Sequence, residues 1–478
     1  MTTGRVDPGR GPRTDPGQPS TPPSPASPVN QNAVPLSELP ATSETPPPGP
    51  VGGDRAPSAA PPGLVERLWA HRASIALLLG LLMVVAVVHA TGMARAPQRV
   101  DDEGTYVAQA WTVQHWRTLG HYTYWYDHPP LGWLLLAAWT TATGAFTRAA
   151  TAVAAGREFM LAVQLVSSAL LYGLARRLGL RRLAAAGAVL AFSLSPLALG
   201  MHRAVYLDNI ATPLLLAAFV LVLSPAQRLA AHAAAGLCLA AAVLVKETSL
   251  LLAPAVIWQY WQVSDRRTRR YSLILSGALF ALVIAAYLLY AALRGELLPG
   301  PEHVSLVEAI RFQLTERAAS GSPLDPNSLS HRTVASWLGQ DPWLLGVATV
   351  LIPAGLAIRR LRPVTAAFAI LVAMVLRPGY LPVPLVIGML PFASLLVAGV
   401  ADTAWGWSGR RTGGTDTSGG RVYRSRGLGP ILVVASLAVA VALAAPQWTR
   451  RDRDLMTVDH DRRFRQSEAW IAGASSTI

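Results

Sequence analysis

The sequence predicts an all-α protein that crosses a membrane many times. Hydrophobic residues make up 52% of its 478 residues and charged residues only 14%, and the mean hydropathy is +0.35. Soluble domains usually carry about a quarter charged residues. A run of about 20 apolar residues is long enough to cross a bilayer as a helix. About eleven transmembrane helices are predicted, near residues 74–93, 157–175, 183–200, 210–224, 230–246, 249–263, 271–293, 343–358, 363–377, 383–403 and 430–446.

The positive charges indicate how the chain is oriented in the cell membrane. The formal net charge is +14, and Lys246 is the only lysine, so the other cations are arginines. The basic clusters lie between apolar runs, as charges beside a membrane do, which argues against a nucleic-acid partner. Because Lys and Arg accumulate in cytoplasmic loops, we expect a cytoplasmic N-terminus. Four clusters should also be cytoplasmic, at Arg176 to Arg182, Arg266 to Arg270, Arg359 to Arg362 and Arg410 to Arg426.

Composition divides the chain into three parts. Residues 1–63 hold 17 of the 37 prolines and almost no aromatic residues, which predicts a disordered cytoplasmic tail. Residues 64–449 form the predicted transmembrane domain, and residues 450–478 a short external segment. Residues 131–146 are short for a span and are expected to form an interfacial or re-entrant helix; a crossing there would raise the count to twelve. The single cysteine, Cys238, excludes a disulfide within the chain.

This orientation places most of the unusual polar residues on the external side. Two external loops are long, at residues 97–156 and 294–342. Further polar residues follow at HRAVYLDN (His202 to Asn209), KET (Lys246 to Thr248) and RPGYLP (Arg377 to Pro382). Ionisable residues near membrane depth are usually functional, so one face of the protein is expected to hold its site.

Three acids open the first external loop in the stretch DDEGTYVAQAW. Asp101, Asp102 and Glu103 precede residues at loosely helical spacing, so they also fit the first turn of an interfacial helix, whose positive N-terminus acids favour. The stretch YWYDHPPLGW lies in the same loop, and its Pro-Pro pair holds Asp127 and His128 in an extended conformation. Each stretch alone fits a structural role, but the two together point to a site.

Together the two stretches resemble the protein O-mannosyltransferase superfamily, whose members are GT-C glycosyltransferases. Asp102-Glu103 match the family's Asp-Glu pair, and DHPPLG matches its His-Pro-Pro-Leu stretch. The family's further polar positions correspond here to Arg157, Arg203, Asp208, Lys246 and, more loosely, Arg377 and Tyr380. The resemblance covers residues 100–252 well and the remainder only as a pattern of spans. The extra Asp101 makes the catalytic position ambiguous, and we favour Asp102 because Glu103 follows it directly.

The resemblance implies an inverting glycosyltransferase with a GT-C fold. It would take a mannose- or arabinose-like sugar from a polyprenyl-phosphate donor to a hydroxyl of an external protein, lipid or glycan acceptor. Residues 97–156 would be the catalytic loop, with Asp102 as the base and Glu103 as its catalytic neighbour. The substrate- and phosphate-binding residues would be Asp127, His128, Arg157, Arg203, Lys246, Arg377 and Tyr380.

The chemistry of such a transfer agrees with these residue types. A carboxylate within hydrogen-bond reach of the acceptor hydroxyl can take its proton. The departing phosphate gains negative charge, which cationic side chains or a divalent cation stabilise in a partly dry site. Asp102 and Asp208 are the candidate ligands of such a metal, although no His or Cys spacing requires one.

Several of these residues also fit structural roles. Arg203 and Asp208 fit an exposed pair between helices, and Lys246 with Glu247 fits a charge pair at a helix end. The polar residues from Glu302 to Arg317 fit a solvated amphipathic helix, or a site for the acceptor. The alternative function is a transporter or lipid-linked-sugar flippase without transferase activity. It predicts internal repeats and ionisable residues at mid-membrane, whereas here no such repeat is evident and the charges gather on one face.

Overall fold

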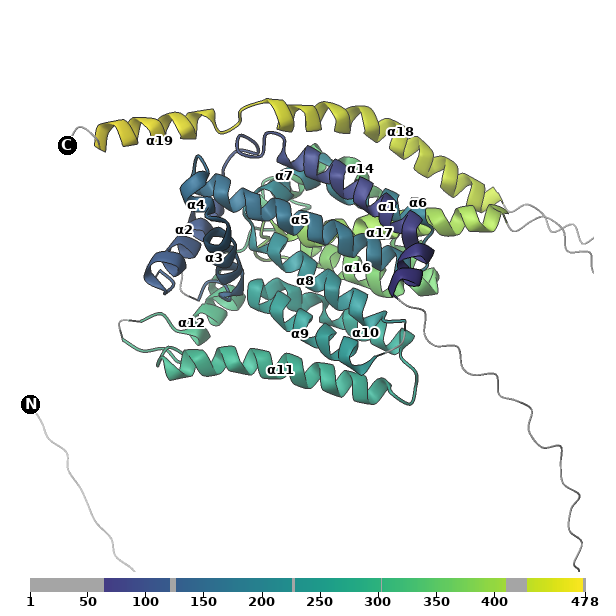
Figure 1. Cartoon of the computed structure of the whole chain (residues 1–478), viewed down its shortest axis with the longest axis horizontal. Helices are drawn as coiled ribbons and strands as arrows, with labels where there is room; N and C mark the ends of the chain where they lie inside the picture. Colours follow the sequence, from purple (N-terminus) through teal and green to yellow (C-terminus); the bar gives the residue numbers. More distant parts are fainter. Residues whose placement is uncertain (1–63, 121–125, 226–227, 302, 410–427, 476–478) are drawn as a thin grey trace, which may run out of the picture. The chain divides into compact units, whose positions relative to one another are not determined.

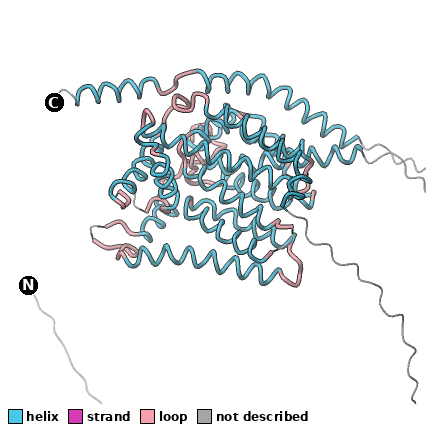
Figure 2. The backbone as a smooth tube through the Cα atoms, viewed as in Figure 1, coloured by secondary structure: helices cyan, strands magenta, loops and turns pink. Residues whose placement is uncertain are grey.

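The computed structural model describes residues 64–120, 126–225, 228–301, 303–409 and 428–475, and this part of the chain is built from helices (Figure 1). Loops join the helices, and no strand occurs among the described residues (Figure 2). The predicted tail at residues 1–63 and the basic cluster at residues 410–426 lie outside the described residues. The predicted all-α fold is confirmed.

The helices follow one another along the chain as α1 Leu64–Ala90, α2 Asp101–Trp116, α3 Leu131–Thr143, α4 Ala145–Arg148, α5 Ala152–Arg177, α6 Arg182–Leu194, α7 Pro196–Arg203, α8 Leu207–Val222, α9 Leu229–Val245, η1 Glu247–Leu252, α10 Ala253–Val263, α11 Arg269–Leu293, α12 Leu306–Arg311, η2 Phe312–Glu316, α13 Leu329–Gln340, α14 Pro342–Val350, α15 Ile352–Ala357, η3 Arg359–Leu361, α16 Arg362–Leu376, α17 Leu385–Gly409, α18 Leu428–Thr457 and α19 Arg462–Ser475.

A row of packed helices forms one side of the bundle. α1 contacts α5, α5 contacts α8, α8 contacts α9, and α9 contacts α11, and Figure 1 shows these helices lying side by side. α17 packs against α6, α14 and α16 and has most of its apolar surface buried, so it lies in the core. α11 leaves most of its apolar surface exposed, as a helix that faces lipid does.

Four helices are each long and apolar enough to cross a membrane: His71–Ala90, Ala152–Arg177, Arg269–Leu293 and Leu385–Gly406. α6 and α7 meet the same requirement together, with a bend of 61° between them. The shorter apolar helices are α3, α8 and α9. The count of eleven spans therefore stays a prediction.

Prolines explain why several apolar runs are not single helices. Pro196 begins α7, Pro254 lies in the first turn of α10, and Pro353 lies in the first turn of α15. A proline ring lacks the N–H that would continue a preceding helix, whereas its fixed φ suits the first turn of a new one. A hydropathy profile does not show where a proline interrupts a helix. The apolar pattern therefore predicts each of these interrupted runs as one span.

α3 has 13 residues, about 20 Å of helix, so it is too short to cross a bilayer. It packs against α2, α5, α8 and α9. Near the other end of the chain, α18 runs without a break through the predicted domain boundary at residues 449 and 450. It packs against α7 and α17, so the C-terminal part of the chain is attached to the bundle.

Small residues allow α9 and α11 to approach closely, as in many membrane helix pairs. A Cβ on Gly236 of α9 would lie 2.3 Å from the carbonyl oxygen of Ser276, whereas a Cβ on Gly277 would have no atom within 4 Å. We expect Gly236→Ala to destabilise the protein by about 1–3 kcal/mol through overpacking, lowering the midpoint of thermal unfolding in detergent. Gly277→Ala is the matched control and should leave that midpoint unchanged or raise it. Equal midpoints in the two variants would contradict the close approach.

Candidate active site

α2 begins at the three acids that follow α1 in the sequence, Asp101, Asp102 and Glu103. Val100 precedes it with an extended backbone (φ −116°, ψ 155°), and the acids form the first turn. Glu103 also accepts a hydrogen bond from the backbone N–H of Val100 at 3.3 Å. Asp101 and Asp102 are exposed, whereas Glu103 is fully buried. The first turn of α2 therefore places Asp101 and Asp102 at the surface and Glu103 in the protein interior.

Glu103 is bound in the protein interior by Arg157 of α5. Nε of Arg157 donates to Oε1 of Glu103 at 2.9 Å, and Nη2 donates to Oε2 at 2.8 Å. Neither side chain has exposed surface. The backbone N–H of Val205 donates to Oε1 of Glu103 at 3.0 Å. Bidentate arginine–carboxylate pairs are strong and directional. The Glu103 carboxylate therefore connects α2, α5 and the turn before α8.

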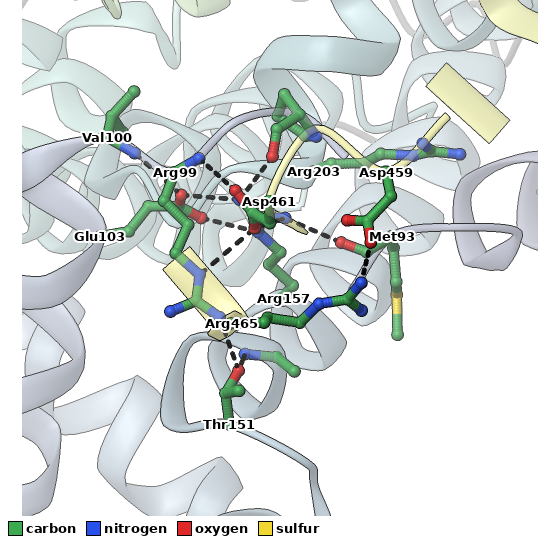
Figure 3. A network of polar contacts seen from close by, with 12 residues as sticks. Met93, Arg99, Val100, Glu103, Thr151, Arg157, Arg203, Asp459, Asp461 and Arg465 are labelled. Atoms are coloured by element: carbon green, nitrogen blue, oxygen red, sulfur yellow. Dashed lines mark hydrogen bonds and ion pairs between the residues drawn. The ribbon is translucent and has the colours of Figure 1, made fainter. Parts of the chain in front are cut away.

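Arg157 also binds groups beyond Glu103 (Figure 3). Its Nη1 donates to the carbonyl oxygen of Met93 at 3.0 Å, and its Nη2 donates to that of Pro97 at 2.9 Å. Nη1 lies 3.3 Å from Oδ2 of Asp461, which comes from the C-terminal part of the chain. We call Arg99, Glu103, Arg157 and Asp461 the Arg157 network.

Arg203 is occupied in a similar way. Its Nη2 donates to the carbonyl oxygens of Val88 at 2.6 Å and Thr91 at 2.7 Å, where α1 ends. Its Nη1 donates to the carbonyl oxygen of Leu455 in α18 at 2.7 Å. The last carbonyls of a helix have no partner within the helix, so Arg203 satisfies them. Arg157 and Arg203, which the resemblance assigns to phosphate binding, both have protein acceptors in this structure.

His128 lies at the centre of a second group of charges. It is 5% exposed, and its Nδ1 lies 3.1 Å from Oε2 of Glu247. Its Nε2 lies 3.4 Å from Oδ2 of Asp127 and 2.9 Å from Nζ of Lys246. Lys246 is also 5% exposed, and its Nζ lies 3.8 Å from Oε1 of Glu247. A buried ammonium needs such partners to remain charged.

Helix ends bring these residues together. Pro130 precedes α3, and Lys246 follows the last residue of α9 with an extended backbone (φ −148°, ψ 116°). Gly132 lies in the first turn of α3, where a Cβ would lie 2.6 Å from the Leu207 side chain and 3.2 Å from that of Val245. The glycine of DHPPLG thus lets α3 approach α8 and α9, which places His128 beside Lys246.

Asp102 faces the same charges. Partial burial of the carboxyl raises the pKa of Asp102 above its usual value, while electrostatic interactions with Lys246 and His128 act in the opposite direction. Asp208 lies in the first turn of α8 and is 9% exposed. It also interacts electrostatically with Lys246 and His128. We call Asp102, Asp127, His128, Asp208, Lys246 and Glu247 the His128 cluster.

Two residues of the long loop at residues 294–342 lie beside the cluster. Nε2 of Gln313 donates to Oδ1 of Asp127 at 2.7 Å, and Oε1 of Gln313 accepts from Nη1 of Arg317 at 2.5 Å. The Arg317 guanidinium lies 3.6 Å from the centre of the Tyr380 ring, a cation–π contact. Its charge also acts on the Asp102 carboxylate. The long loop therefore supplies a cation next to the proposed base.

The structure thus divides the predicted site residues into two groups. Asp102, Asp127, His128, Asp208 and Lys246 lie in the His128 cluster, and Tyr380 joins it through Arg317. Glu103, Arg157 and Arg203 are buried among structural partners, and Arg377 is exposed after α16.

Sequence reasoning missed three residues of this region. Glu247 follows the only lysine, so its position in KET was a usable signal. Gln313 and Arg317 gave a weaker signal, because the pattern of their segment fits a solvated helix as well as a site for the acceptor.

A divalent cation bound by Asp102 and Asp208 stays a prediction. Within the described ranges, no group of three or more His, Cys, Asp or Glu side chains is placed to hold a metal ion. Such a cation would need most of its ligands from water and from the donor phosphate. The Lys246 ammonium already lies in the field of both carboxylates, and the mechanism proposed below does not depend on a metal.

Comparisons with known proteins bear on the family similarity and the fold of this chain. Residues 127–290 match the family model of dolichyl-phosphate-mannose-protein mannosyltransferases. This segment runs from DHPPLG to the end of α11 and includes His128, Asp208 and Lys246. No curated protein sequence matches the chain.

Solved structures with a similar fold include ArnT from Cupriavidus metallidurans. Its apo structure is 17% identical with a TM-score of 0.51, covering 81% of this chain and 75% of ArnT. ArnT bound to undecaprenyl phosphate is 16% identical with a TM-score of 0.51, covering 80% and 75%. The archaeal oligosaccharyltransferase AglB from Archaeoglobus fulgidus, in complex with an inhibitory peptide and a dolichol-phosphate, is 11% identical with a TM-score of 0.50, covering 82% and 56%.

These structures are GT-C glycosyltransferases, and their similarity shows the GT-C fold of this chain. The several apolar helices and this fold make the chain a multi-pass membrane protein. Residues 127–290 are thus similar to the dolichyl-phosphate-mannose-protein mannosyltransferase family, and the chain as a whole has the GT-C fold.

Proposed function

We propose that this protein transfers a mannose- or arabinose-like sugar from a polyprenyl-phosphate donor to a hydroxyl of an external protein, lipid or glycan acceptor, with Asp102 as the base. One observation carries the proposal. Asp102 is exposed beside the cations of the His128 cluster, whereas the adjacent Glu103 is buried and bound to Arg157. A base and a set of cations for a leaving phosphate are thus side by side.

The proposed reaction is a single displacement. Asp102 takes the proton of the acceptor hydroxyl, and the oxygen attacks the anomeric carbon of the donor sugar. The bond between that carbon and the phosphate oxygen breaks, and the polyprenyl phosphate leaves with the bonding electrons. Attack opposite the leaving group inverts the anomeric configuration. Asp101 is the alternative base on sequence alone, but the electrostatic interactions with Lys246 and His128 involve Asp102.

The leaving phosphate would be stabilised by Lys246 and Arg317. The ammonium of Lys246 is almost fully buried, so its field is weakly screened by water. Arg317 is held by the Tyr380 ring and Gln313, which orients its guanidinium before a ligand arrives. His128 would hold the lysine in place, because its Nε2 can accept from the Lys246 ammonium while its Nδ1 donates to Glu247. Preoriented cations of this kind stabilise developing negative charge without reorganising.

The ends of α5 support an external position for the site. Arg157 lies near the N-terminal end of α5 and binds Glu103 in the first turn of α2. The 26 residues of α5 make this helix about 39 Å long. Its last turn carries Arg176 and Arg177, and Arg181 and Arg360 beyond it both contact Asp402 of α17. Positive charge gathers on the cytoplasmic side of membrane proteins. The opposite end, with the His128 cluster, would then be external, as would the N-terminal end of α2.

Asp102→Asn tests the base. We expect it to lower kcat for transfer from a polyprenyl-phosphate sugar by about 10²–10⁴-fold, which is the usual contribution of a general base. Radiolabelled donor and membranes containing the protein would give the rate. Asp101→Asn is the matched control and should keep most of the wild-type rate. A large loss of rate in Asp101→Asn together with a near wild-type rate in Asp102→Asn would show that Asp102 is not the base. Vectorial transport of the donor without sugar transfer would favour the flippase.

The pH dependence of transfer provides a second test of Asp102. The base works only when it has lost its proton, so kcat/KM should fall as the pH falls through the pKa of Asp102. Because burial raises this pKa, the midpoint of the acid limb should lie above the 3.8 of an ordinary aspartate. Lys246→Met removes a charge that lowers the pKa, so the midpoint should move to higher pH. Arg311→Met, in an exposed ion pair with Glu316, is the control. A midpoint at or below 3.8 would contradict the role.

Arg317→Met tests the contribution of the long loop to donor binding. Losing a hydrogen-bonded cation should weaken donor binding by about 10–100-fold, since bonds to charged groups are worth about 1.5–3 kcal/mol. The KM for the lipid-phosphate donor should rise, and Tyr380→Leu should give a smaller rise because the guanidinium remains. Arg311→Met again serves as the control on the same loop. An unchanged KM in Arg317→Met would remove this residue from the proposed site.

A further inference from the structure

We propose that Asp461 is a positioning residue for the catalytic loop, which makes the C-terminal segment of the chain part of the active-site framework. The inference rests on the proposed function, in which Asp102 is the base. It adds a residue far beyond the segment of the chain that the mannosyltransferase family model matches.

Asp461 lies between α18 and α19 and is completely buried. Its Oδ1 accepts from the backbone N–H of Arg99 at 2.8 Å, and its Oδ2 lies 3.2 Å from Nε of Arg99 and 3.3 Å from Nη1 of Arg157. Its own N–H donates to the carbonyl oxygen of Arg95 at 3.0 Å. Figure 3 shows the carboxylate between the two arginines. Asp461 therefore holds the residues that lead directly into α2 and its acids.

The charges of the Arg157 network balance only when Asp461 is included. Arg99 and Arg157 are the two cations, and Glu103 and Asp461 are the two anions. The side chains of Arg157, Glu103 and Asp461 have no exposed surface, so water does not screen an excess charge there. Without the Asp461 carboxylate, Arg99 and Arg157 would each lose an acceptor, and Glu103 would be the carboxylate that remains beside Arg157. Glu103 is adjacent to Asp102, so a shift of its carboxylate would move the base.

Other contacts hold the C-terminal segment independently of Asp461. A Cβ on Gly92 would lie 2.5 Å from the carbonyl oxygen of Met456, so α18 packs directly on the backbone of the turn after α1. Arg203 donates to the carbonyl oxygen of Leu455. A change at Asp461 alone should therefore leave α18 in place and alter mainly the loop that precedes α2.

Asp461→Asn keeps the shape of the side chain and removes its charge. We expect kcat for sugar transfer to fall by about 10–100-fold, since small displacements of a catalytic group have effects of this size. The KM for the polyprenyl-phosphate donor should change little, because Lys246 and Arg317, which would bind the donor phosphate, do not contact Asp461. Amide hydrogen exchange over residues 93–103 should become faster.

Two further variants make the test specific. Asp459→Asn is the matched control, because Asp459 pairs with Arg465 and not with the Arg157 network. It should keep the wild-type kcat and the wild-type exchange over residues 93–103. The double variant Asp461→Asn with Arg99→Gln restores equal numbers of cations and anions within the Arg157 network. It should recover part of the kcat lost in Asp461→Asn, which a purely structural loss of the C-terminal segment would not allow.

The outcomes separate this inference from the proposed function. If the wild-type protein transfers sugar and Asp461→Asn does so with an unchanged kcat, the positioning role is overturned. An equal loss in Asp459→Asn would overturn it as well, since the effect would then belong to α19 as a whole. If the wild-type protein transfers no sugar, the proposed function fails. Hydrogen exchange then still decides, because unchanged exchange over residues 93–103 in Asp461→Asn would show that Asp461 does not hold the loop.

Discussion

Where α2 meets α5, the carboxylate of Glu103 binds the guanidinium of Arg157 and neither side chain reaches solvent. Two charges in a weakly polarisable interior lose most of their hydration, so each depends on the other and on further hydrogen bonds. Val205, Met93 and Pro97 supply these bonds from other segments. The pair therefore determines how α2 is rotated about its axis. Successive residues of a helix are about 100° apart, so inward placement of Glu103 turns Asp102 toward the other residues of the His128 cluster.

The two charged groups have different physical characters. The Arg157 network is closed, because its arginines bind protein acceptors that come from both ends of the chain. The His128 cluster is more open, since Asp102 is exposed and the side chain of Glu247 is 41% exposed. A closed network suits the positioning of a loop, whereas an open cluster with a buried ammonium suits binding of an anion that arrives and leaves. Arg99 and Arg157 of the closed network already have protein acceptors, so the donor phosphate would not contact them.

Local patterns in the chain were enough to find most of the candidate site. DDEG and DHPPLG each fit a structural role alone, but their occurrence in one loop points to a site. Lys246 is notable because it is the only lysine of the chain. The helical fold also followed from the apolar runs. The positions of Pro196, Pro254 and Pro353 divide several of these runs into shorter helices. Hydropathy averages over a window and does not show such breaks, so the number of spans could not be read from it.

The sequence by itself determined that the chain is a helical membrane protein and that its first long loop carries acids and a Pro-Pro segment. Helical periodicity and hydropathy are properties of neighbouring residues, so the chain displays them directly. Only the tertiary structure decided which of the adjacent acids is buried, that Arg157 and Arg203 bind protein acceptors, and that Arg317 lies near Asp102. It also brought Asp461 to Arg157, a partner more than 300 residues earlier. The partner of a buried charge is chosen by packing among distant segments, and no local pattern records that choice.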